Sequence, residues 1–126
     1  DGGRYAFYDT TLDGFKALDS LIQRKYRGLS PIAFANKYAP KSDKDPNNDP
    51  VAYGTSLAGQ LGINPNTGVI DVDNPKVRSV LMKRIATLEG PVNRFNLDEA
   101  DYASGVLPMP EGYVSRNIRT QSKYYK

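Results

Sequence analysis

Short, repeated signals mark where helices are expected to begin and end in this chain. Three capping side chains directly precede a proline, which favours a first helical turn because the cap accepts a free N–H and proline presets φ. These pairs are Ser30-Pro31, Asp49-Pro50 and Asn74-Pro75. Thr10 with Asp13 gives a similar start, and Asn96 with Glu99 another. Glycine closes three of the apolar runs, at Gly28, Gly62 and Gly90.

This punctuation predicts an all-α protein, a compact bundle of about five short helices with an extended C-terminal arm. The expected helices span residues 11–27, 31–38, 50–61, 75–89 and 97–104. Apolar residues recur at helical spacing inside them, and four are expected in the core: Leu18, Leu57, Leu81 and Ile85. The length of 126 residues fits one such core. We therefore expect a helical domain at 1–106 and an arm at 107–126.

The arm is distinguished by its charge. It contains two prolines and no apolar periodicity, and no acid follows Glu111. Four bases follow it: Arg116, Arg119, Lys123 and Lys126. Since these four bases exceed the net charge of +3 for the whole chain, the charges of residues 1–113 nearly cancel. A segment of this kind cannot offset its own ordering entropy. It is therefore expected to order only against a partner, whose surface should be acidic.

Tyrosines accompany these bases, and tyrosine is favoured at protein interfaces. The expected interface residues are Tyr5, Tyr8, Tyr113, Arg116, Arg119, Lys123, Tyr124 and Tyr125. Aromatic and basic residues together also suit nucleic acid. Their spacing here is loose, so packing on a neighbouring protein subunit is favoured over nucleic acid.

Composition excludes several kinds of chemistry. The chain has no His and no Cys, which removes Ser-His and Cys-His nucleophile pairs and zinc–thiolate sites. Residues 43–49 carry acidic or amide side chains at alternate positions, like the start of a calcium loop. Asn48 stands where that loop needs glycine and Gly54 where it needs glutamate, so a solvated loop is favoured. No metal site, no cofactor and no membrane span are predicted.

Glu89 is the one candidate catalytic residue. It lies at the end of an expected helix, where the helix dipole disfavours a carboxylate. A carboxyl group with a raised pKa in such a place can act as general acid in glycan cleavage, with Asp9 or Asp13 as a second carboxylate. The alternative is an ion pair with a base such as Arg4 or Lys16, and this structural role is favoured.

Four short motifs suggest a relationship to known proteins. They are Asp-Gly-Phe-Lys-Ala-Leu at 13–18, Asn-Lys-Tyr-Ala-Pro at 36–40, Asn-Asp-x-x-x-Tyr at 48–53 and Leu-Glu-Gly at 88–90. In order and spacing, residues 5–91 resemble a family of small virion structural proteins encoded in bacteriophages and prophages. Tyr38 stands where the family has tryptophan and Asp49 where it has threonine, and the segment after Pro91 departs from the pattern.

The resemblance implies a structural or adaptor component of a tailed bacteriophage particle that acts through protein–protein contacts. Its partners would be other virion proteins in a multi-copy assembly. It would be located in the virion, and in the host cytoplasm before assembly. The alternative is a virion-associated peptidoglycan glycosidase, lysozyme-like or a lytic transglycosylase, with Glu89 as general acid and the cell wall as partner. The family transfers no catalytic residue, so the non-enzymatic role is favoured.

Overall fold

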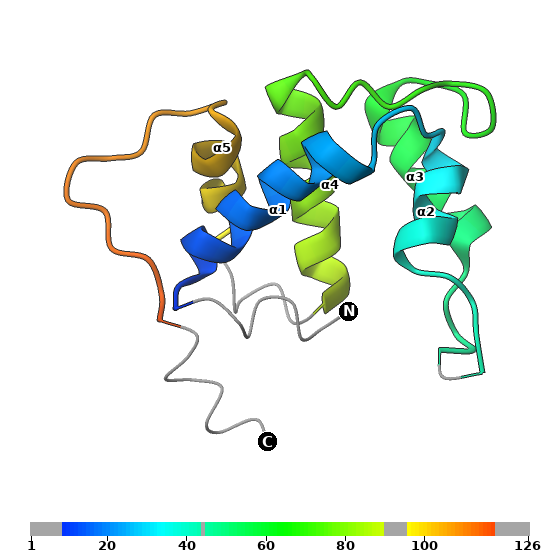
Figure 1. Cartoon of the computed structure of the whole chain (residues 1–126), viewed down its shortest axis with the longest axis horizontal. Helices are drawn as coiled ribbons and strands as arrows, with labels where there is room; N and C mark the ends of the chain where they lie inside the picture. Colours follow the sequence, from blue (N-terminus) through cyan, green and yellow to red (C-terminus); the bar gives the residue numbers. More distant parts are fainter. Residues whose placement is uncertain (1–8, 44, 90–95, 118–126) are drawn as a thin grey trace.

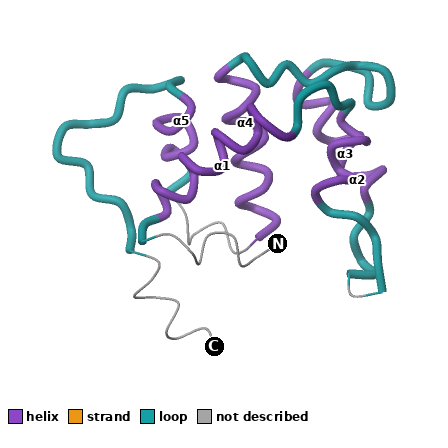
Figure 2. The backbone as a smooth tube through the Cα atoms, viewed as in Figure 1, coloured by secondary structure: helices purple, strands orange, loops and turns teal. Residues whose placement is uncertain are grey.

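Helices dominate the part of the chain that the computed structural model describes, which is residues 9–43, 45–89 and 96–117. They are α1 (Thr11–Lys25), α2 (Pro31–Tyr38), α3 (Pro50–Leu61), α4 (Pro75–Glu89) and α5 (Asp98–Ser104). Every other described segment is a loop or a turn, with one isolated bridge between Thr10 and Asn117 (Figure 2). The predicted all-α class and the five helices are confirmed. α1 ends two residues before the expected position and α5 begins one residue after it.

The expected caps make the hydrogen bonds that start the helices. Oxygen atoms of Thr10, Ser30 and Asp49 accept the backbone N–H three residues ahead, at 3.1, 3.1 and 3.0 Å. At the other end, α3 and α5 stop at Gly62 and Gly105, whose φ angles of 72° and 89° are left-handed. Glycine adopts this conformation without the steric cost that a Cβ brings. The predicted caps Thr10, Ser30 and Asp49 and the predicted stop Gly62 therefore determine these helix ends.

The helices form two groups that share α4. α2 packs against α3, while α1 and α4 both pack against α5, and α4 touches α1 and α3. In Figure 1 the α2–α3 pair lies at the right and α5 at the left, with α1 and α4 between them. No described helix is long and apolar enough to span a bilayer.

The core lies where these helices meet. Leu18, Leu57, Leu81 and Ile85 are all 1% exposed or less, which confirms the prediction made for them. Beside them, the ring of Phe34 meets Tyr26 edge-on at 5.1 Å and stacks on Tyr38 at 5.9 Å between ring centroids. Ile70 and Val72, from the loop before α4, are also buried. This loop thus closes the core although it forms no strand.

Two glycines of α3 are expected to respond in opposite ways to alanine. A Cβ at Gly54 would lie 2.7 Å from the Ile32 Cα, whereas a Cβ at Gly59 would have no neighbour within 4 Å. Gly54→Ala should lower the free energy of unfolding by about 1–2 kcal/mol, because overpacking against backbone outweighs the gain in helix propensity. Gly59→Ala should raise it by about 0.5–1 kcal/mol. Urea denaturation of both variants checks the pair. A stabilised Gly54→Ala protein would contradict the close packing of α2 on α3.

Candidate functional site

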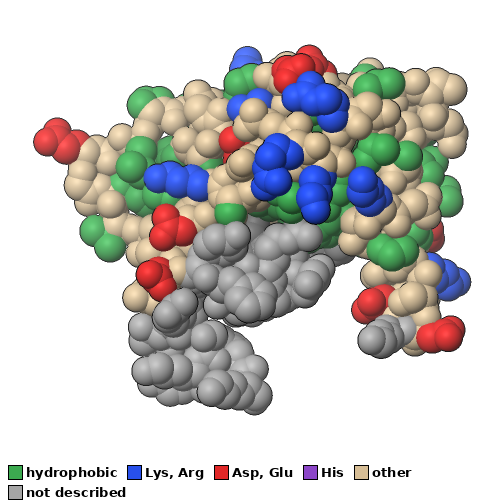
Figure 3. Space-filling view, in the orientation of Figure 1, with side chains coloured by type: hydrophobic (Ala, Val, Ile, Leu, Met, Phe, Trp, Pro, Cys, Tyr) green, Lys and Arg blue, Asp and Glu red, His purple; other side chains and the backbone are tan. Residues whose placement is uncertain are grey.

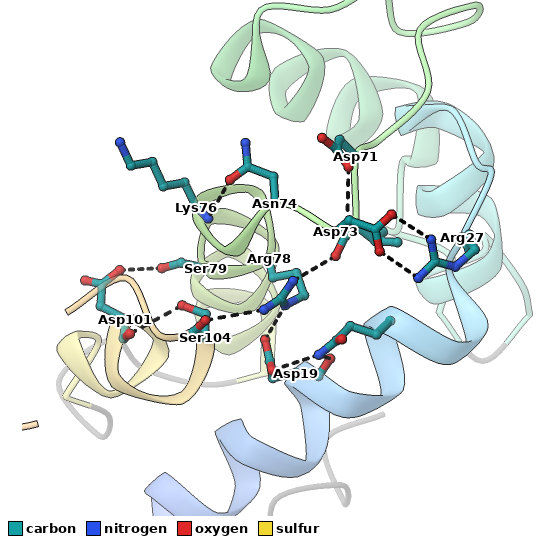
Figure 4. A network of polar contacts seen from close by, with 12 residues as sticks. Asp19, Arg27, Asp71, Asp73, Asn74, Lys76, Arg78, Ser79, Asp101 and Ser104 are labelled. Carbon is teal, nitrogen blue, oxygen red and sulfur yellow. Dashed lines mark hydrogen bonds and ion pairs between the residues drawn. The ribbon is translucent and has the colours of Figure 1, made fainter. Parts of the chain in front are cut away.

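A buried ion pair joins α1, α4 and α5. The Nε of Arg78 donates to the Oδ1 of Asp19 at 2.7 Å, and both side chains are nearly inaccessible to solvent. The two terminal nitrogens of Arg78 donate to the carbonyl oxygens of Val72 and Ser104, at 3.0 and 3.3 Å (Figure 4). Each nitrogen of the guanidinium thus donates to an acceptor of the fold, and the charge is paired with Asp19. The cluster therefore links three helices through one buried side chain.

A second buried carboxylate, Asp101, links α5 to α4. Ser79 Oγ donates to its Oδ1 at 2.5 Å, and Lys83 Nζ to its Oδ2 at 2.9 Å. Burial alone would raise the pKa of Asp101, but these hydrogen bonds and the Lys83 charge outweigh burial and lower the pKa below its usual value. Asp101 is therefore an ionised link between two helices.

Glu99 is the centre of a third buried group. Its side chain is fully buried. Its Oε1 accepts the Thr11 hydroxyl at 2.5 Å, and its Oε2 accepts a short hydrogen bond from the Tyr113 hydroxyl. Asn96 Nδ2 also donates to the Tyr113 oxygen, at 3.0 Å. Glu99 lies in the first turn of α5, as the predicted helix start at Asn96 and Glu99 requires, and its side chain also binds α1 and the C-terminal segment to α5.

We call residues 106–117 the strap. It leaves α5, arches away from the helices and returns to the start of α1 (Figure 1). At its far end, Thr11 N donates to the Arg116 carbonyl at 3.1 Å and Leu12 N donates to Ser115 Oγ at 3.0 Å. The expectation that the arm has no anchor on its own helices is therefore wrong for these residues. The strap is held by polar contacts between residues that are far apart in the sequence. The apolar periodicity of the sequence could not predict such contacts.

The strap presents large apolar side chains to solvent. Leu107 is 45% exposed, Met109 47% and Val114 86%. Val51 and Val69, on α3 and on the loop before α4, are the other large apolar residues exposed in the described parts of the chain. A surface residue of this kind is ordinary when isolated, but three of the large exposed apolar residues in the described parts of the chain lie on this one short segment.

The predicted interface residues are only partly placed. Tyr113 is half-buried, and its ring meets Tyr102 edge-on at 5.3 Å, so it anchors the strap, while its contact with a partner stays a prediction. Arg116 is exposed, and its carbonyl oxygen accepts the Thr11 N–H. The other six lie outside the described residues: Tyr5, Tyr8, Arg119, Lys123, Tyr124 and Tyr125. Their role stays a prediction.

The catalytic candidate also stays a prediction. Glu89 is the last residue of α4, and its side chain lies outside what the structure describes. Asp13 is exposed in the first turn of α1. In the described ranges, no group of three or more acidic side chains is close enough together to hold a metal ion. In the loop at 43–49, Asp49 caps α3 by accepting the Ala52 N–H.

A pocket of about 390 Å³ opens between α3 and α4. Its lining residues are Tyr53, Gln60, Lys83, Arg84 and Thr87. The Arg84 guanidinium lies over the Tyr53 ring, 5.2 Å from the centroid. The sequence analysis noted Tyr53 only as part of the motif at 48–53 and did not predict the pocket, because its lining residues come from two helices and meet only after folding. On the face seen in Figure 3, further Lys and Arg side chains lie over the middle of the molecule. One exposed base, Arg27, forms an ion pair with Asp73 at 2.9 Å.

Comparison with known proteins adds no relative. No family model, curated protein or solved structure matches the chain.

The strap is expected to loosen in alkali. Burial, and then the hydrogen bond to Glu99, raise the pKa of Tyr113 from 10.0 to about 12. Folding thus favours the protonated hydroxyl, so its stabilisation is fully present below the ordinary pKa and is lost as the pH rises through the folded one. The stability of the protein should fall across this window. In Tyr113→Phe that part of the fall should be missing, since the other tyrosines titrate equally in both proteins. Unfolding curves at several pH values measure this difference in stability. Parallel pH profiles of the two proteins would contradict the role of Tyr113 in holding the strap.

Proposed function

We propose that this chain is a structural or adaptor component of a tailed bacteriophage particle, and that the strap is its contact surface for another virion protein. The observation that carries the proposal is the solvent exposure of three apolar side chains, Leu107, Met109 and Val114, on one short segment. The ends of this segment are held by α1 and α5. The phage setting rests on the resemblance of residues 5–91 to virion proteins.

A fixed apolar segment is well suited to binding. Burial of exposed apolar surface is worth about 25 cal/mol per Å². The cost of ordering a flexible segment is subtracted from this gain. The Leu107 N–H donates to the Asp101 carbonyl at 3.2 Å, and Tyr113 N donates to the Pro110 carbonyl at 3.1 Å. These bonds order the strap before it meets a partner, so more of the burial free energy remains for affinity.

Charge refines the expected partner. Arg116 is exposed at the end of the strap, and the sequence continues with Arg119, Lys123 and Lys126. A partner with an apolar patch beside acidic side chains matches both features. The bases would set orientation and association rate, while the apolar residues would supply most of the binding free energy.

Incorporation into particles tests the proposal. A tagged chain is produced in cells that form the particles, and its copy number is measured in gradient-purified virions. The variant with Leu107, Met109 and Val114 changed to Ser should be incorporated at least about tenfold less, because three apolar contacts are lost. A variant with Val51→Ser and Val69→Ser removes exposed apolar residues elsewhere, and should be incorporated normally.

Three outcomes would contradict the proposal. The first is absence of the unchanged chain from purified particles. The second is equal incorporation of both serine variants. The third is cell-wall cleavage by the purified chain that is lost in a folded Glu89→Gln protein, which would favour the glycosidase alternative.

A further inference from the structure

The pocket between α3 and α4 offers mainly hydrogen-bond donors. Arg84 uses its two terminal nitrogens to bridge the helices, donating to Gln60 Oε1 at 3.0 Å and to Ser56 Oγ at 2.9 Å. The Thr87 hydroxyl donates to the Lys83 carbonyl at 2.9 Å. The Gln60 side-chain oxygen thus already accepts a hydrogen bond from Arg84. The Gln60 amide N–H groups can donate to a ligand that has hydrogen-bond acceptors.

Two further polar atoms beside the pocket are shielded from water. The Tyr53 hydroxyl and the Arg84 Nε meet no partner at full hydrogen-bonding geometry. Burial raises the pKa of Tyr53, and the charge and hydrogen bonding of the adjacent Arg84 side chain oppose this only in part, so the hydroxyl keeps its proton at neutral pH. Tyr53 therefore positions the Arg84 guanidinium, and the terminal nitrogens of Arg84 are the donors that a ligand can reach.

The pocket also holds a positive charge that no described acid balances. Lys83 is paired with Asp101. Arg84 lies beside it on α4, and its described hydrogen-bond partners, Gln60 and Ser56, are neutral. Exchange of one neutral acceptor for an anion would replace an ordinary hydrogen bond with a charge-assisted one, which is shorter and stronger.

We propose that this pocket binds a carboxylate group. A carboxylate has two acceptor oxygens and no donor, and its geometry fits the planar fork of arginine. In the bound state the carboxylate oxygens take N–H groups from the terminal nitrogens of Arg84, in exchange for Gln60 or Ser56. The 390 Å³ of space admits a small organic acid or the acidic side chain of another protein. This inference does not depend on the strap, which contacts α1 and α5.

NMR titration of the intact chain with succinate tests the site. Neutral succinamide and sodium chloride at matched ionic strength are the reference additives. Succinate alone should shift the Arg84 Nε–H and the Gln60 amide resonances in a saturable way. Arg84→Gln should weaken binding at least about tenfold, the ratio that loss of one charge-assisted hydrogen bond gives. Arg24→Gln, an exposed change on α1, should bind as the unchanged protein does.

Tyr53→Phe separates binding from folding. It removes the hydroxyl beside the Arg84 guanidinium but keeps the ring beneath it, so the Tm should change little. A less firmly held guanidinium should bind succinate about threefold to tenfold more weakly. Tighter binding of a capped tripeptide with a central Glu than of succinate would assign the carboxylate to a protein partner. The reverse order would assign it to a free acid. Equal shifts with succinate and chloride, or unchanged affinity in both pocket variants, would overturn the proposal and leave Arg84 a helix-bridging residue only.

Discussion

Arg78→Met is expected to lower the free energy of unfolding by about 3–5 kcal/mol, as loss of one partner of a buried ion pair does. Methionine fills much of the same space, so packing changes little. The loss comes from Asp19, which remains buried with Gln23 Nε2, at 3.1 Å, as its remaining side-chain donor among the described residues. The carbonyl oxygens of Val72 and Ser104 lose their donor as well. Urea denaturation at neutral pH measures the change.

A double variant separates the charge from the shape. Asp19→Leu combined with Arg78→Met leaves no buried charge, so it should recover about 1–3 kcal/mol of the loss. Recovery should be incomplete because the two carbonyl oxygens still lack a donor. Arg27→Met is the matched control, since Arg27 forms an exposed pair with Asp73 and exposed pairs contribute little. A double variant as unstable as Arg78→Met would show that the cost does not arise from an unpaired Asp19.

Glu99→Gln should destabilise the protein by about 1.5–3 kcal/mol, the usual worth of a hydrogen bond to a charged group. Glutamine has the same size but only one acceptor oxygen. Either Thr11 or Tyr113 therefore faces an amide N–H group instead of an acceptor. Asp98→Asn changes an exposed acid in the first turn of the same helix, and it should cost at most about 1 kcal/mol.

Hydrogen exchange shows whether the effect is local to the strap. Thr11 and Leu12 donate their N–H groups to Arg116 and Ser115 of the strap. The Ser115 hydroxyl lies 3.1 Å from Thr11 Oγ1, and the Thr11 proton goes to Glu99. Loss of the Glu99 carboxylate should thus speed exchange at Thr11 and Leu12 more than within α3. Uniform acceleration across all helices would mean that Glu99 supports the whole fold and not the strap in particular.

The two proposed contact surfaces differ in what their loss should do. The strap is held to α1 and α5 by polar contacts, so its release should leave the α2–α3 pair intact. Under the proposed function, release of the strap should also weaken assembly. The pocket lies between α3 and α4, which share few contacts, and Arg84 bridges the gap. Variants at Glu99 and at Arg84 therefore test independent proposals.

The sequence by itself determined the helices and much of the core. Ser30, Asp49 and Gly62 act on backbone groups within a few residues of themselves, so their effects are local and can be read directly. Apolar spacing predicted Leu81 and Ile85 in the core because burial of one helix face follows from the period of 3.6 residues. A charged residue on the same face carried a further signal: Arg78 lies three positions before Leu81, where a buried residue is expected.

Only the tertiary structure decided which polar groups meet. Glu99 accepts a hydrogen bond from Thr11, which lies 88 positions away in the sequence, and Arg78 donates to Asp19, which lies 59 positions away. Such pairs depend on how the helices cross and on the return path of the strap, which local propensity does not encode. The pocket has the same origin, since Tyr53 and Arg84 belong to different helices. Capping and periodicity act along one helix, whereas these sites arise between helices, and that is why the fold could be predicted from the sequence and the sites could not.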